Sequence, residues 1–167
     1  MQGFDEAQGV LTTVDYSTDT GVILAGTLVN SHMIFLNSDG ITVLKHFEVV
    51  WTFANPIIGV MSDRWGTLEA ASSFELGNPL TTYIDTHPGS GPAAPFFDRG
   101  LEPESVDAYA IVNPTTLRVS MGVTEPGDWI RVVTEANPIP EPTTMHLLGS
   151  GLVGLAGFRR KKKIRRQ

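Results

Sequence analysis

Cysteine is absent from this 167-residue chain. Its absence excludes disulfide scaffolds, thiolate zinc sites and thiol nucleophiles. The phosphate-binding loop, the dinucleotide fingerprint and the Gly-x-Ser-x-Gly nucleophile elbow are also missing. The four histidines are scattered with no pair at a spacing of two or four residues, so no zinc site is predicted.

Basic residues are scarce over most of the chain. The formal net charge is -6, and only five of the twelve Lys and Arg residues precede residue 159. An acidic body repels phosphate backbones, so we expect no nucleic-acid partner. The other seven form a C-terminal basic cluster: Arg159, Arg160, Lys161, Lys162, Lys163, Arg165 and Arg166.

The part before the tail is long enough for one domain with its own core. Alternating apolar residues and many β-branched residues predict strands, and Gly, Pro, Asn and Asp separate them. The predicted strands are residues 10–14, 22–29, 33–36, 41–53, 57–61, 108–112, 115–121 and 129–134. Residues 66–77 are expected to hold one or two turns of helix. The prediction is a mainly β protein: a single antiparallel β-sandwich or jelly-roll-like domain followed by one C-terminal transmembrane helix.

Three acidic or hydroxyl side chains at alternate positions, Asp15, Ser17 and Asp19, resemble the start of a calcium loop. The glycine that follows is one place late for an EF-hand loop, and position twelve holds Gly26 instead of a glutamate. We favour a polar turn between strands, with no cofactor, and keep calcium as the alternative.

The body offers weak candidates for sugar chemistry. Asp85 with His87, or Asp98 with Glu102, could form the acid–base pair of a glycosidase, but sequence spacing does not establish the required geometry. Trp51 and Trp129 fall in strand patterns and are expected in the core, whereas Trp65 is expected on a loop, where it could stack on a sugar ring. We expect a body without enzymatic activity.

The tail combines three features. Residues 143–158 carry no charge and would form a helix about 24 Å long, short of the roughly 30 Å hydrocarbon core unless flanking residues extend it. The basic cluster behind them should stay cytoplasmic, which places the body on the other side of the membrane. In front, Pro140, Glu141 and Pro142 disfavour helix and should form an extended strip that a protease can bind.

A Pro-Glu-Pro tripeptide, a short Gly-rich apolar span and a terminal Arg/Lys cluster resemble the PEP-CTERM sorting signal of Gram-negative bacteria. The resemblance covers about residues 139–166. It implies processing by exosortase, a membrane-embedded cysteine protease, and a link to exopolysaccharide and biofilm. Such proteins normally carry an N-terminal signal peptide, which residues 1–21 do not resemble, so we expect an export segment encoded upstream.

These observations predict four regions: a β-sandwich body (1–136), a linker with the Pro-Glu-Pro motif (137–142), a transmembrane helix (143–158) and a basic cytoplasmic tail (159–167). The predicted function is that of an exported, membrane-tethered protein of the surface or exopolysaccharide matrix. Its body would be structural, adhesive or weakly glycan-binding. The expected partners are exosortase, the membrane and exopolysaccharide, and the expected route runs from the inner membrane, with a periplasmic body, to the cell surface or matrix. The alternatives are a surface polysaccharide hydrolase and an uncleaved, tail-anchored structural protein.

Overall fold

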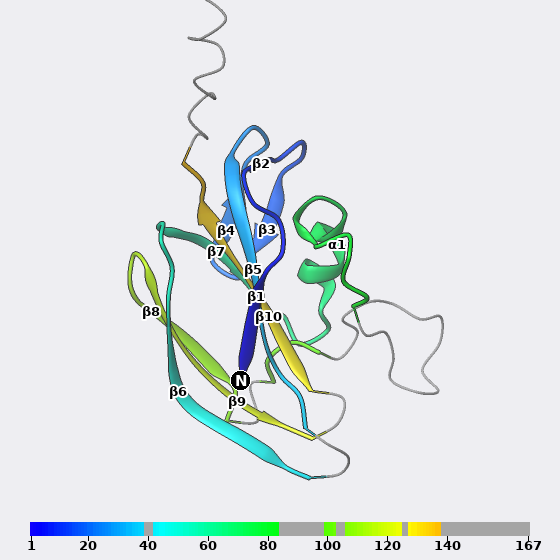
Figure 1. The fold of residues 1–167 in the computed structure, drawn as a ribbon, viewed down its shortest axis with the longest axis vertical. Helices are drawn as coiled ribbons and strands as arrows, with labels where there is room; N and C mark the ends of the chain where they lie inside the picture. The colour runs from blue at the N-terminus through cyan, green and yellow to red at the C-terminus, as the bar shows by residue number, and fades with distance from the viewer. Residues whose placement is uncertain (39–41, 84–98, 103–105, 125–126, 138–167) are drawn as a thin grey trace, which may run out of the picture. The chain divides into compact units, whose positions relative to one another are not determined.

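Antiparallel strands make up most of the body in the computed structural model, which describes residues 1–38, 42–83, 99–102, 106–124 and 127–137. The chain divides into two units, Met1–Asn137 and Pro138–Gln167, and the described residues all belong to the first. Figure 1 shows the described elements of the first unit, which are two main sheets, a two-stranded hairpin sheet and one helix.

The larger sheet has the strand order β1–β5–β10–β7, and β2 pairs with the start of β5. Its strands are β1 (Gln2–Asp5), β2 (Val10–Leu11), β5 (Leu28–Leu36), β7 (Ile57–Met61) and β10 (Asp128–Glu135). The smaller sheet has the order β6–β9–β8, with β6 (Leu44–Thr52), β8 (Ala108–Asn113) and β9 (Thr116–Val123). A hairpin of β3 (Tyr16–Thr18) and β4 (Gly21–Ile23) and the helix α1 (Thr67–Leu76) complete the described elements.

The two sheets bury one apolar core between them. Alternate residues of β5 and β10 point toward the smaller sheet, because side chains of a strand alternate between its faces. They meet alternate residues of β9 in a cluster that includes Ile34, Leu36, Leu117, Val119, Met121, Ile130 and Val132. The prediction of a mainly antiparallel β body is confirmed.

The other face of the larger sheet is covered by α1 and the β3–β4 hairpin (Figure 1). A second cluster there joins the hairpin, the helix and the sheet: Tyr16, Ile23, Val29, Met61, Leu76 and Val133. Gly59 lets the hairpin approach β7, since a Cβ added there would lie 2.6 Å from Thr18 Cγ2. The central strands β5 and β10 are therefore buried on both faces.

Helix α1 is longer than the sequence predicted, at ten residues. Gly66 enters it with a φ of 64°, and the Asp63 carboxylate accepts hydrogen bonds from the Thr67 and Leu68 backbone N–H groups at 3.0 and 2.8 Å. These bonds satisfy two of the N–H groups that a helix start leaves without a partner. The helix ends at Gly77.

The predicted strand 22–29 is wrong as one element, since a turn divides it into β4 and β5. Gly26 has a φ of 83°, a conformation that other residues rarely adopt, and the Thr27 N–H donates to the Leu24 carbonyl. The predictions missed β1 and β3 altogether. The predicted transmembrane helix lies outside the described residues, and within the part that the structure describes no helix is long and apolar enough to cross a membrane.

Candidate functional site

A cleft of about 440 Å³ opens at one end of the two-sheet body, between β1 and β5 of the larger sheet and the end of β6. Its floor is the inner face of the larger sheet, and the segment from Trp51 to Asn55 forms a wall. The polar residues that line it are Asp5, Gln8, Asn30, His32, Thr52, Asn55 and Thr134.

His32 is held in the cleft by three contacts. Its Nδ1 lies 2.6 Å from Asp5 Oδ1, and its Nε2 lies 3.1 Å from the Thr134 hydroxyl. Because an ionised carboxylate can only accept, Nδ1 carries the proton that it donates to Asp5. The ring also packs against Phe53 at a centroid distance of 4.9 Å. These contacts fix the orientation of the imidazole and its tautomer.

Trp51 forms the aromatic side of the cleft. The ring is half-buried and packs on the backbone of Gly3, where an added Cβ would lie 2.9 Å from the ring atom Cζ3. Only glycine therefore allows this close approach of β1 to the ring. Trp51 was expected in the core; it does pack against the main cluster, and it also lines the cleft.

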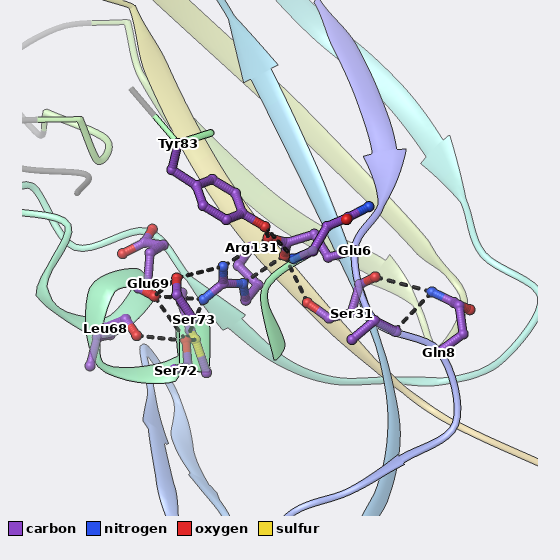
Figure 2. Close-up of polar contacts among 12 residues, drawn as sticks. Glu6, Gln8, Ser31, Leu68, Glu69, Ser72, Ser73, Tyr83 and Arg131 are labelled. Atoms are coloured by element: carbon purple, nitrogen blue, oxygen red, sulfur yellow. Dashed lines mark hydrogen bonds and ion pairs between the residues drawn. The ribbon is translucent and has the colours of Figure 1, made fainter. Parts of the chain in front are cut away.

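A polar network lies on the opposite face of the larger sheet, beneath α1 (Figure 2). The guanidinium of Arg131 binds both carboxylate oxygens of Glu6, at 2.6 and 2.8 Å, and both side chains are fully buried. Its remaining N–H groups donate to the Ser72 and Ser73 hydroxyls and to the Glu69 carbonyl. All five donors of this arginine are satisfied, which is what a buried cation requires.

Ser31 and Tyr83 complete the shell around Glu6. The Ser31 hydroxyl donates to Glu6 Oε2 at 2.8 Å, and the Tyr83 hydroxyl donates to Glu6 Oε1. Burial, together with the hydrogen bond to Glu6, raises the pKa of Tyr83 to about 12. The charged atoms of this network are hydrogen-bonded and closed to solvent. The network therefore holds α1 against the sheet, and we assign it a structural role.

Glu69 contributes its backbone carbonyl to the network, while its side chain stands apart. The residue is 1% exposed, and no described donor bonds its carboxylate oxygens; a protonated Glu69 lies within reach to donate a hydrogen bond to the Asp63 carboxylate. Burial, with the negative charge of Asp63 adding to it, raises the pKa of Glu69 well above its ordinary value. The side chain is therefore held as a neutral acid over a wider pH range than a solvated glutamate.

Asp128 is a second buried carboxyl, at the start of β10. Burial raises its pKa to about 8, and the nearby charges of Asp107 and Glu102 add to the rise, while Arg99 opposes it. Asp107 is tied to the backbone: its carboxylate accepts from the Gly122 N–H at 2.7 Å and from the Glu102 N–H at 3.2 Å. Within the described residues, no group of three or more His, Cys, Asp or Glu side chains could hold a metal ion.

The structure places Asp15, Ser17 and Asp19 along the β3–β4 hairpin without bringing the two carboxylates onto one point. Asp15 accepts a hydrogen bond from the Ala25 N–H at 2.8 Å, whereas Asp19 binds the Ser62 N–H and hydroxyl at 3.1 and 2.7 Å. The Ser17 side chain is exposed. Asp15 thus closes the base of the hairpin, and Asp19 attaches the hairpin to the segment after β7. Calcium stays an untested alternative to the prediction of no cofactor.

Trp65 lies in the turn before α1, as expected, and is 52% exposed. The guanidinium of Arg64 sits 5.1 Å from the ring centroid, in cation–π contact. Trp65 is not among the residues that line the cleft. Of the two acid–base pairs weighed above, Asp85, His87 and Asp98 lie outside the described residues.

The cleft was missed at the sequence level because its residues come from four separate stretches of chain. A signal is present in hindsight: Asn30 and His32 occupy the same face of β5 as Ile34 and Leu36, so a core-facing row turns polar. In the sequence these polar residues interrupt the apolar pattern, and the predicted strands 22–29 and 33–36 lie on either side of them.

The predicted sorting signal lies outside the described residues, both its tripeptide Pro140, Glu141 and Pro142 and its basic cluster from Arg159 to Arg166. It can be compared with known proteins by sequence. Residues 138–161 match the family model of the PEP-CTERM protein-sorting motif. The chain carries a PEP-CTERM sorting signal. The match begins two residues before the tripeptide, covers the tripeptide and the uncharged stretch 143–158, and ends at Lys161 inside the basic cluster.

The PEP-CTERM signal implies an exported, membrane-associated protein of the cell surface that is targeted to exosortase. The signal covers the tail alone and assigns no role to the body. Searches of the curated proteins and of the solved structures returned no match to the chain.

Proposed function

We propose that the chain is an exported surface or exopolysaccharide-matrix protein that exosortase processes at its C-terminus, with a non-enzymatic body that serves structure, adhesion or weak glycan binding. The observation that carries the proposal is the PEP-CTERM match over residues 138–161. Residues 143–158 would hold the newly exported chain in the inner membrane, and the basic cluster behind them would stay cytoplasmic. The body would then lie on the periplasmic side, where the Pro-Glu-Pro strip is accessible to a membrane protease.

The cleft supports a binding role over a hydrolytic one. Glycoside hydrolysis in its usual form requires two carboxyl groups placed on either side of the scissile bond. Among the described residues that line the cleft, Asp5 supplies the one carboxylate. The polysaccharide hydrolase is therefore the less favoured candidate.

The sorting proposal is tested by expressing the full chain in a host with exosortase and in an otherwise identical host from which the exosortase gene has been deleted. We expect a shorter mature chain that leaves the inner membrane in the first host, and a full-length chain retained in the membrane in the second. Mass spectrometry of the purified chain and its distribution between membrane and surface fractions measure this. The same mass and distribution in both hosts would contradict the proposal and favour the alternative of an uncleaved, tail-anchored structural protein.

A further inference from the structure

The inner face of the larger sheet changes from apolar to polar along its length. On β10, Ile130 and Val132 belong to the core, while Thr134, two residues further on the same face, reaches the cleft. On β5 the same change occurs between Ile34 and His32. The polar side chains at this end bond to partners within the protein and also line the cleft, so this end of the inner face suits a polar occupant better than an apolar one.

We propose that this cleft binds a neutral sugar unit of a glycan. The inference rests on the proposed surface location, where glycans are available, and it names the site at which the body would bind one. A volume of about 440 Å³ falls within the roughly 300–1,000 Å³ of small-molecule sites.

The aromatic side of the cleft suits the apolar face of a pyranose ring. Trp51 is fixed by its packing on Gly3, so its ring offers a flat surface at little cost in conformational entropy. Phe53 lies beside it and is itself held against His32. A rigid aromatic wall facing a polar floor matches a ligand that has C–H groups on one side and hydroxyls around its rim.

The polar groups of the cleft match sugar hydroxyls, which both donate and accept. The Gln8 amide donates to the Ala7 and Ser31 carbonyls and offers its oxygen as an acceptor. The Asn30 amide accepts from the Gly9 N–H and donates one N–H to the Glu135 carbonyl, and the Asn55 oxygen accepts from Asn137, so both can still offer an N–H as a donor. The side chain of Asp5 is 69% exposed and can accept from a sugar hydroxyl while Oδ1 remains bonded to His32. A hydrogen bond to a carboxylate is about twice as strong as one between neutral groups, which makes Asp5 the principal polar anchor.

The charge of the cleft selects against acidic sugars. The described lining contains the Asp5 carboxylate and no Lys or Arg side chain. A uronic acid or a sulfated sugar would bring a second negative charge to Asp5 with no Lys or Arg side chain in the described lining to balance it. The site therefore favours neutral glycans.

The test measures binding of the purified full-length protein, in mild detergent, to neutral tetrasaccharides of glucose, mannose or galactose and to the tetramer of galacturonic acid. Saturation-transfer NMR and calorimetry give the epitope and the affinity. We expect saturable binding of at least one neutral tetrasaccharide and at least about tenfold weaker binding of the acidic one. Trp51→Ala should weaken neutral binding about tenfold or more, which corresponds to loss of one aromatic contact of about 1.4 kcal/mol. Trp65→Ala, which removes an exposed tryptophan outside the cleft, should leave it unchanged.

Asp5→Asn is the second cleft variant and is expected to fold like the parent, because it replaces one exposed side chain by a nearly isosteric one. It should weaken neutral binding about fivefold while the circular dichroism spectrum stays that of the parent. Absence of binding to every neutral tetrasaccharide would overturn the proposal, as would binding that survives both cleft substitutions or depends on Trp65. Because the assay contains no exosortase, a chain that is sorted but binds no sugar refutes the cleft alone. A chain that binds sugar but is not sorted refutes the surface proposal alone.

Discussion

Glu69 is a carboxyl group that the fold buries on the core side of α1, and it should make stability depend on pH. Its pKa in the folded protein is raised, mainly by burial, above the ordinary value of 4.5. Its stabilising contribution is therefore fully present below pH 4.5 and is lost as the pH rises toward the folded value. Asp128, with a pKa raised to about 8, acts in the same direction between pH 3.8 and about 8.

Glu69→Gln mimics the neutral acid at every pH, and its amide can donate to the neighbouring Asp63 carboxylate. We expect the variant to lose less stability than the parent between pH 5 and pH 8, and Glu69→Gln combined with Asp128→Asn to lose least. Denaturant unfolding at pH 5, 6, 7 and 8, followed by tryptophan fluorescence, measures this. If the unfolding free energies of the parent and of the double variant changed by the same amount between pH 5 and pH 8, the assignment of both groups would be wrong.

Arg131 and Glu6 form the most buried ion pair that the structure describes. Removing one partner leaves the other charge buried without compensation, which costs about 3–5 kcal/mol, whereas replacing both by apolar residues is often close to neutral. Arg131→Met should therefore destabilise the body by about that amount, and Arg131→Met with Glu6→Met should recover most of the loss. Urea unfolding midpoints compare the two. A double variant as unstable as the single one would mean that the serines and Tyr83, and not the uncompensated charge, dominate the cost.

At the scale of elements, the strands with regular alternation could be predicted and the interrupted ones could not. Residues 57–61 were predicted with the bounds that β7 has, because apolar and β-branched residues fill it. β3 was missed because Ser17 and Thr18 have the composition of a turn, and the strand exists only through its pairing with β4 and its packing on the larger sheet. Tertiary contacts override weak local preference in such cases.

The contacts that make a site are harder still to predict. Asp5 and His32 are 27 residues apart and Glu6 and Arg131 are 125 apart, and no local pattern links either pair. The C-terminal signal was found from sequence because its three parts are contiguous. The cleft needed the fold, since β1 places Asp5 beside His32 through strand pairing.

The start of α1 depends on Asp63, which binds two backbone N–H groups and the Thr67 hydroxyl. These hydrogen bonds lower the pKa of Asp63 against the opposing effect of burial, so the carboxylate stays charged where it caps the helix. Asp63→Ala should destabilise the body by about 1 kcal/mol, the usual cost of losing a helix cap. Thermal melting of the two chains at pH 7 measures the difference. Asp63→Asn, which keeps the accepting oxygen, is the matched control and should lose less.

At the scale of the whole molecule, the chain joins a body with a cleft to a tail that carries the delivery signal. If a protease reads the Pro-Glu-Pro tripeptide at the membrane surface, the extended backbone that its prolines favour and its negative charge matter, because neither is needed for a helix to insert. Changing Pro140, Glu141 and Pro142 to alanine would also let a helix grow outward through these positions, since alanine is the strongest helix former and proline the weakest.

We therefore expect the triple alanine variant to reach the membrane like the parent and to accumulate there at full length in a host with exosortase. Glu141→Gln keeps both prolines and separates charge from shape: processing that fails in both variants depends on the charge, and processing that fails only in the triple variant depends on the extended backbone. The mature mass and the ratio of membrane to surface protein decide between them. A triple variant with the mass and distribution of the parent would show that the tripeptide is not what the protease reads, because a plain membrane anchor tolerates these changes.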